Sequence, residues 1–147
     1  MALREFLEHQ RAGVLEGGPR SKITAWKAAV SALNARFRDV LGKFEQLRLI
    51  DWNVLRDHAG LRYNAEALTI EFDDSVITLE PNAIEPDAGI LGRASLNCGV
   101  REIHLDCAPD GKLWKYHRVI PHDPASAELT DEAIEALVEE LFKSTAS

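Results

Sequence analysis

The feature that most constrains this chain is a run of large apolar residues, from Ile23 to Leu47, at alternating spacings of three and four. An α-helix turns once in about 3.6 residues, so this spacing places the whole run along one side of a helix. The pattern therefore predicts one amphipathic helix over residues 21–47, with Ser21 as its N-cap. We call the apolar run the heptad seam; its members are Ile23, Trp26, Val30, Leu33, Phe37, Val40, Phe44 and Leu47.

A helix of this length is long for a chain of 147 residues. At about 1.5 Å per residue it would extend roughly 40 Å, more than the width of a small sheet whose strands lie about 4.8 Å apart. We therefore expect part of the heptad seam to contact a second copy of the chain or another protein. The expected contacts are Ile23, Trp26, Val30, Phe37 and Phe44.

Beyond the helix, apolar residues recur at every second position, which is the spacing of a strand with one buried face. Residues 50–55 predict a first strand, residues 57–60 a turn, and Leu61 the start of the next extended segment. A hairpin is predicted over residues 68–79, with Asp74–Ser75 as its two-residue turn.

A second hairpin is predicted from residues 102–107 and 112–120, joined by a type I turn at Pro109–Gly111. This turn would place three pairs of polar and aromatic residues opposite one another on one sheet face. The pairs are Asp106 with Trp114, His104 with Tyr116, and Glu102 with Arg118. Trp114 and Tyr116 would then lie on the outer face, where they either contact a partner or are covered by a second layer such as the N-terminal arm or the last helix.

The predicted polar face has two interpretations. As a site, His104, Asp106, Tyr116 and Arg118 would serve acid–base chemistry or bind a metal ion, because alternate strand residues lie about 7 Å apart on one surface. As a solvated sheet face, the same residues are explained by a Glu102–Arg118 ion pair and a contact of His104 with Tyr116. We favour the second interpretation, because one strand face does not supply the convergent polar groups of a catalytic pocket.

A last helix is predicted after Thr130, which is a favourable N-cap residue. Its opposite sides differ in character. The acidic side includes Glu135, Glu139 and Glu140, and it is either a docking surface for a basic partner or a solubilising surface. The buried side comprises Ile134, Leu137, Val138, Leu141 and Phe142.

The order of helix, strands and helix predicts an α+β fold. It would consist of a long N-terminal amphipathic helix, an antiparallel meander-like sheet of about five strands and a C-terminal helix, with the helices mainly on one sheet face. Gly17, Gly18 and Pro19 separate an N-terminal arm, residues 1–20 with a short helix over residues 2–10, from a single domain over residues 21–147.

Composition excludes several functional classes. The net charge of −7 makes nonspecific nucleic-acid binding unfavourable. The charge is also uneven: residues 1–62 carry 11 Lys and Arg against 7 acidic residues, and residues 63–147 carry 6 against 17, so the two halves should attract. No apolar run approaches the roughly 20 residues of a membrane-spanning helix and the N-terminus lacks a signal-peptide pattern, so we expect a cytoplasmic protein without a membrane partner.

Motifs of common catalytic sites do not occur in the sequence. No serine has a glycine-flanked elbow, and Gly89 and Gly92 do not form a phosphate loop. Cys98 and Cys107 are too few for a zinc site or a disulfide framework, so we expect them to be reduced and buried. We expect no metal ion and no cofactor.

The sequence therefore favours a small acidic protein-interaction module over an enzyme. The expected roles are an accessory subunit, a dedicated chaperone, or an immunity or antitoxin-type inhibitor, acting as an oligomer or in a complex. The alternative is a small enzyme or ligand-binding protein that uses the polar sheet face around His104, with residues 81–92 as the rim of its site.

Overall fold

The computed structural model describes Leu3 and residues 18–145. The predicted short helix over residues 2–10 lies outside the described residues, apart from Leu3. Along the described residues, one helix is followed by seven strands and then by a second helix. The elements are α2 (Pro19–Leu41), β1 (Arg48–His58), β2 (Leu61–Phe72), β3 (Ser75–Ile84), β4 (Gly92–Cys98), β5 (Arg101–Cys107), β6 (Trp114–Ile120), β7 (Asp123–Glu128) and α3 (Asp131–Thr145).

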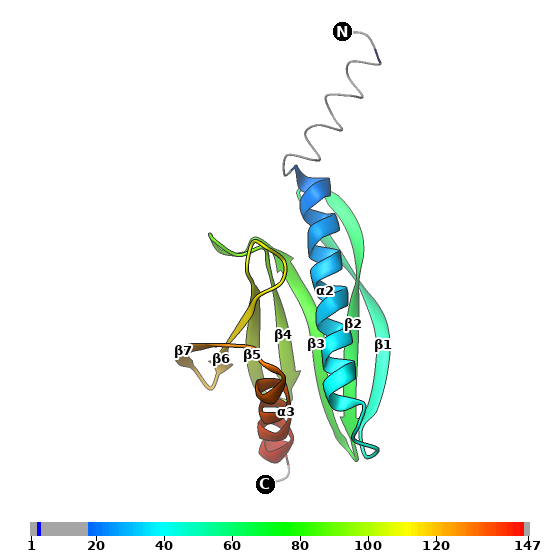
Figure 1. The fold of residues 1–147 in the computed structure, drawn as a ribbon, viewed down its shortest axis with the longest axis vertical. Helices are drawn as coiled ribbons and strands as arrows, with labels where there is room; N and C mark the ends of the chain where they lie inside the picture. Colours follow the sequence, from blue (N-terminus) through cyan, green and yellow to red (C-terminus); the bar gives the residue numbers. More distant parts are fainter. Residues whose placement is uncertain (1–2, 4–17, 146–147) are drawn as a thin grey trace.

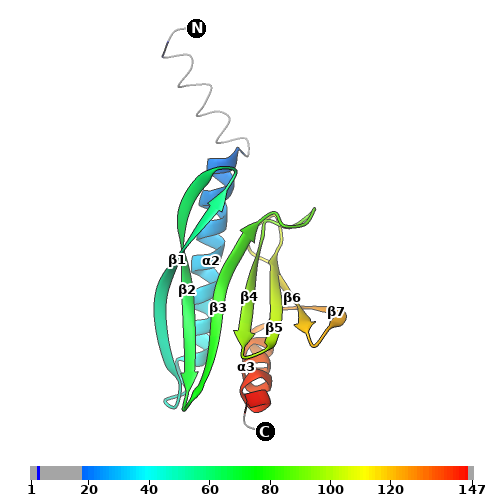
Figure 2. The ribbon, with the colours of Figure 1, turned by 180° about the vertical axis from the view of Figure 1, so that it is seen from behind.

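The seven strands form one antiparallel sheet in which each strand pairs with its neighbour in the sequence, from β1 to β7. Both helices lie against one side of this meander (Figures 1 and 2), with α2 along β1 to β3 and α3 beside β4. The predicted α+β class is confirmed, but the strand count is seven rather than about five. None of the described helices is long and apolar enough to cross a membrane.

The long helix is shorter than its apolar pattern predicts, because it begins at Pro19 and ends at Leu41. Gly18, not Ser21, occupies the N-cap position, and proline fits the first helical position because its missing N–H is not needed there. Gly42 ends the helix with its N–H donating to the Arg38 carbonyl at 2.7 Å. The last two members of the heptad seam, Phe44 and Leu47, therefore lie beyond the helix.

The heptad seam within α2 packs against the chain's own sheet. The expectation that Trp26, Val30 and Phe37 face a partner is wrong, because all three are fully buried in the core, and Ile23 is half-buried against it. The helix lies along the strands and not across them (Figure 1). The 11 residues of β1 extend about 36 Å and the 23 residues of α2 about 35 Å, so the sheet covers the helix lengthwise.

The hairpin of β1 and β2 twists strongly around the helix (Figure 1). In β2 the buried residues are odd-numbered up to Ala67 and even-numbered from Leu68, which is also the first residue of β2 that pairs with β3. Beyond that point Arg56 of β1 spans to β3, where its guanidinium donates to the Pro81 carbonyl at 3.0 Å and to Glu80 at 3.1 Å. The twist thus lets both halves of β2 contribute to the core.

Both predicted hairpin registers are wrong. The first turn is Asp73–Asp74, with Asp73 in the left-handed region at φ 51°, so Phe72 pairs with Ser75. In the second hairpin Cys107 pairs with Trp114, which shifts the register by one residue. In this second hairpin, the shift of one residue moves every side chain of β6 to the other sheet face.

Trp114 shows the consequence of this shift. The predicted exposed residue is 2% exposed and lies on the helix side of the sheet, so it is not available to a partner. Its ring lies 5.8 Å from that of Trp26. Trp26 in turn packs on Gly92, where a Cβ would meet the indole at 2.5 Å, so glycine is required there by close contact.

The last helix follows its prediction closely. The Ala133 N–H donates to the Thr130 hydroxyl at 3.1 Å, which is the expected N-cap bond. The predicted apolar side is buried in the core, except that Phe142 is half-buried. Arg36 of α2 donates to the Leu129 carbonyl at 2.8 Å and so holds the start of this helix against the first one.

Candidate functional site

An apolar groove of about 500 Å³ lies at the end of the molecule where α2 finishes. Three segments form it: the end of α2 with the loop that follows, the end of β2, and one side of α3. Its lining residues are Leu41, Phe44, Gln46, Leu47, Phe72, Glu135, Val138, Glu139, Phe142 and Lys143.

The floor of the groove is core, and its mouth is aromatic. Leu41 and Val138 are buried, whereas Phe44 is 37% and Phe72 is 39% exposed. The ring of Phe142 meets that of Phe72 edge-on, with centroids 5.7 Å apart. Large aromatic side chains held at the surface around a buried floor are typical of contact sites for apolar groups.

Local chain geometry explains why Phe44 is at the surface. The helix stops at Gly42, where a Cβ would lie only 2.6 Å from the Arg38 carbonyl, so the tight turn needs glycine. The chain then folds back through two turns, with the N–H of Phe44 donating to Leu41 at 3.0 Å and that of Leu47 to Phe44 at 3.1 Å. These turns carry Phe44 away from the helical seam to the mouth of the groove.

Charged residues form the rim of the groove as two ion pairs, Lys43 with Glu135 and Lys143 with Glu139. The Lys43 ammonium lies 3.2 Å from Glu135 and 5.2 Å from the centre of the Phe44 ring. The Lys143 ammonium lies 2.8 Å from Glu139; this contact lowers the pKa of the Glu139 carboxyl and raises that of Lys143. The rim is therefore charge-balanced, and pairs so exposed are easily exchanged for other partners.

Three of the residues predicted to bind a partner meet in this groove: Phe44, Glu135 and Glu139. Glu140 lies apart, because the Arg118 guanidinium holds it in a two-pronged ion pair with distances of 2.6 and 2.8 Å, which lowers the pKa of its carboxyl. Sequence reasoning missed Phe72, the exposed aromatic end of β2. The available signal was an aromatic residue directly before a turn.

The polar sheet face differs from its prediction, because the register shift separates the four candidate catalytic residues. His104 and Asp106 lie on the face away from the helices, whereas Tyr116 and Arg118 pair with the buried residues Leu105 and Ile103 on the helix side. The proposed set of His104, Asp106, Tyr116 and Arg118 is therefore not one site. The expected Glu102–Arg118 pair is also wrong, since Arg118 binds Glu140 of α3.

On the outer face, His117 takes the place that the prediction gave to Tyr116. The His104 and His117 rings meet edge-on with centroids 5.3 Å apart. His104 Nε2 lies 3.5 Å from Glu102, and His117 Nδ1 lies 3.8 Å from Asp106. Burial, and then the positive charge of Arg93, lower the pKa of His104. Both effects favour the neutral imidazole.

Asp106 is not free to act as a base, because Arg93 binds both of its oxygens at 2.6 and 3.2 Å. Among the described residues, no three His, Cys, Asp or Glu side chains lie grouped so as to hold a metal ion. Cys98 and Cys107 are buried and unpaired, and burial raises the pKa of the Cys107 thiol to about 12. A thiol with that pKa is a poor nucleophile.

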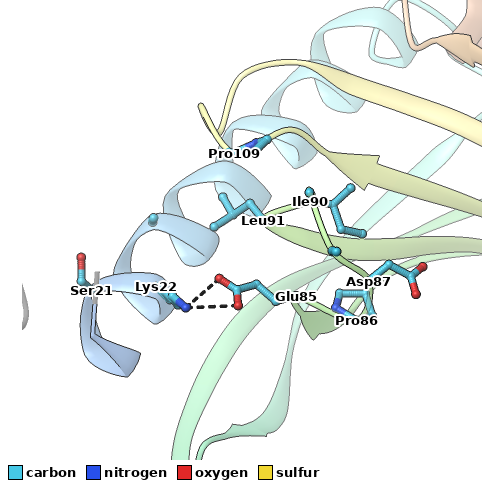
Figure 3. Close-up of a pocket in the computed structure, with 11 residues that line it drawn as sticks. Ser21, Lys22, Glu85, Pro86, Asp87, Ile90, Leu91 and Pro109 are labelled. Carbon is cyan, nitrogen blue, oxygen red and sulfur yellow. Dashed lines mark hydrogen bonds and ion pairs between the residues drawn. The ribbon is translucent and has the colours of Figure 1, made fainter. Parts of the chain in front are cut away.

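A second hollow, of about 550 Å³, lies between the first turn of α2 and the loop over residues 85–91 (Figure 3). The predicted loop over residues 81–92 is shortened, because β3 continues to Ile84 and β4 begins at Gly92. Lys22 closes one side of the hollow through an ion pair with Glu85 at 2.8 Å. Its lining includes the charged residues Lys22, Glu85 and Asp87 and no aromatic residue, so it is more polar than the groove.

Comparison with protein-family models, with curated proteins and with solved structures finds no match for this chain.

Proposed function

We propose that this chain is a protein-interaction module that binds an amphipathic helix of a partner protein in the apolar groove. The observation that carries the proposal is the exposure of Phe44 and Phe72 at the mouth of a groove with a buried floor. A few aromatic residues set around a hollow supply most of the binding energy in many protein interfaces.

The length of the groove supports a helix as its occupant. The α3 wall consists of residues at i, i+3, i+4, i+7 and i+8, which is one face of two helical turns, or about 12 Å. A partner helix with apolar anchors at i, i+3 or i+4, and i+7 matches this length. The wall residues are Glu135, Val138, Glu139, Phe142 and Lys143.

The charges of the rim support recognition by apolar anchors. Lys43 and Lys143 balance Glu135 and Glu139 around the groove, although the chain as a whole carries −7. A neutral rim neither steers a basic partner strongly nor repels an acidic one. Association through the groove should therefore depend only weakly on salt concentration.

This activity suits the roles expected from the sequence: an accessory subunit, a dedicated chaperone, or an immunity or antitoxin-type inhibitor in the cytoplasm. The acidic residues Glu135 and Glu139 belong to the proposed interface as rim groups, whereas Glu140 stabilises the fold through Arg118.

The test is affinity purification of the tagged chain from its native cells, with variants matched for exposure. Phe44→Asp and Phe72→Asp place a charge at the mouth of the groove and should reduce recovery of the bound partner at least tenfold. Leu113→Asp is the control. Leu113 is also 39% exposed, but it lies in the turn before β6 and does not line the groove.

The thermal midpoint of each variant is measured in parallel. The proposal predicts loss of the partner with Phe44→Asp and Phe72→Asp at an unchanged midpoint, and retention with Leu113→Asp. Equal recovery with all three variants would show that the groove is not the binding site.

A further inference from the structure

The strand β1 forms one edge of the sheet, and its backbone geometry defines which groups face outward. The two-residue turn Ala59–Gly60, with both residues at positive φ, makes His58 and Leu61 the closing hydrogen-bonded pair. Hydrogen-bonded pairs recur at every second position, so the even-numbered residues of β1 bond to β2. The outward N–H and C=O groups belong to Leu49, Asp51, Asn53, Leu55 and Asp57.

This edge is long, regular and uncapped. β1 pairs with β2 over all 11 of its residues without a bulge. Within residues 18–145 no loop backbone bonds to it, and the Leu55 carbonyl accepts a hydrogen bond only from the Arg56 side chain, at 3.4 Å. An edge of this kind is a template for an added strand.

The opposite edge, β7, lacks this capacity. It has six residues, one of which is Pro124, and its pairing with β6 shifts between His117 and Arg118. A short strand, a proline and a bulge are the usual devices that prevent strand addition. The contrast singles out β1 as the open edge of the sheet.

The exposed face of β1 carries more carboxylates than cations, which disfavours a second copy as the added strand. Asp51 and Asp57 share this face with Leu55 and with Glu66 and Arg62 of the neighbouring strand. A two-fold axis that relates two antiparallel edge strands stands perpendicular to the sheet, so it keeps each residue on its own face. Pairing of two copies would therefore bring Asp51 and Asp57 of both onto one face, and like charges across strands are destabilising.

We infer that β1 binds an extended segment of another protein as an added strand, with basic residues opposite Asp51 and Asp57 and an apolar residue opposite Leu55. The aspartates already contact Arg38 and Arg62, but the Asp57–Arg62 pair is long, at 3.6 Å, and both of its side chains are mostly exposed. A lysine on the added strand can therefore replace Arg62. The added backbone would pair with the ten outward N–H and C=O groups of the five edge residues.

The test is amide hydrogen exchange of the whole chain, resolved by residue, with the capped peptide Lys-Thr-Val-Thr-Thr-Thr-Lys. We expect exchange at Asp51, Asn53 and Leu55 to slow at least tenfold, with no change at Trp52 and Val54, whose N–H groups already bond to β2. The peptide with glutamate in place of both lysines is the control and should give no protection. Protection by both peptides, or binding without protection of the odd-numbered amides, would overturn the inference.

Two variants separate strand addition from other binding modes. Asn53→Pro removes an outward N–H that β2 does not use, so it should abolish protection by the peptide, whereas Asn53→Ala should retain it. Asp57→Lys, which leaves the backbone unchanged, should shift preference toward the glutamate peptide. Protection of the same amides that rises with protein concentration in the absence of peptide would replace this inference with self-pairing.

Discussion

At the scale of single residues, contacts within the chain account for the charged and aromatic side chains of the outer sheet face. Arg93 holds Asp106, and Glu102 lies beside His104, so the charged groups of this face are matched within the chain. The remaining imidazole, His117, stacks edge-on against His104. These contacts stabilise the face within the chain, and the titration of His104 should therefore report on folding stability.

The lowered pKa of His104 gives stability a predictable pH dependence. The unfolded imidazole titrates near its usual pKa of 6.5, whereas the folded one binds its proton only at lower pH. The unfolded state therefore binds more protons below pH 6.5, and the free energy of unfolding should fall as the pH drops from there through the folded pKa. Denaturant unfolding at pH 7.5, 6.5 and 5.5 measures this slope.

The charged neighbours of His104 are Arg93, Glu102, Asp106 and His117, so a variant is needed to assign the slope. His104→Gln should flatten the slope between pH 6.5 and 5.5. An identical slope in wild type and His104→Gln would assign the effect to other groups.

Gly92 is predicted to be intolerant of any side chain. A Cβ at this position would meet the Trp26 indole at 2.5 Å, so Gly92→Ala should destabilise the fold by about 1–3 kcal/mol through overpacking. Thermal unfolding measures the loss. Trp26→Leu removes the clash, so the double variant should lose less stability than the sum of the two single variants; strict additivity would refute the contact.

At the scale of elements, the sequence predicted well what local chemistry controls. Thr130 caps α3, and the apolar side of this helix is buried as its spacing indicates, because caps and periodicity depend on neighbouring residues. The end of α2 was predicted six residues too late. The apolar spacing continues past Gly42, and the pattern weighed apolar residues more than the glycine that ends the helix.

The hairpin registers depend on turn geometry that the sequence pattern did not reveal. The turn after β5 is longer than a type I turn, because the Asp110 carboxylate accepts bonds from the N–H groups of Lys112 and Leu113 at 2.8 and 3.2 Å. The Ala108 N–H then closes the loop on the Leu113 carbonyl at 2.8 Å. This extra length moved Tyr116 and Arg118 off the predicted site.

The candidate groove was predicted only in part for a related reason. Phe44, Glu135 and Glu139 were expected to contact a partner, but the sequence assigned them to two separate surfaces. The groove arises where three segments distant in the sequence meet, and only the fold brings Phe72 and Phe142 beside Phe44. β7 was missed because Pro124 and its polar neighbours resemble a loop.

Substitutions in the two parts of the heptad seam should differ in how much stability they cost. Phe37 is fully buried, so Phe37→Ala should reduce the free energy of unfolding by about 3–5 kcal/mol. Phe44→Ala, beyond the helix, should cost less than about 1 kcal/mol, because its side chain is partly exposed already. Urea unfolding compares the two, and equal losses would show that Phe44 belongs to the core.

At the scale of the whole molecule, three exposed apolar side chains, Phe44, Phe72 and Val76, gather at one end. The loop after α2, the tip of the β2–β3 hairpin and the C-terminal half of α3 meet there (Figure 2). Phe72 and Val76, on either side of the hairpin tip, are 39% and 44% exposed. The other end and the outer sheet face carry ion pairs, such as Lys22 with Glu85 and Arg93 with Asp106, and their exposed apolar residues, such as Leu55 and Leu113, line no part of the groove.

The central claim is therefore that a partner protein binds in the groove. A partner that binds there should tolerate salt, because apolar burial contributes most of the association free energy and the rim is neutral. Binding of the native partner at about 50 mM and 500 mM salt should differ by less than threefold. A loss of tenfold or more at high salt would instead assign binding to the acidic side of α3.

The most direct measurement is photo-crosslinking in native cells from a photoreactive phenylalanine analogue at position 44. The account predicts one crosslinked partner, joined through a segment with apolar residues at i, i+3 or i+4, and i+7, and the same partner from position 72. The analogue at position 113 should give no such product. Crosslinks from position 44 that match those from position 113, or that end only within the chain itself, would contradict the account.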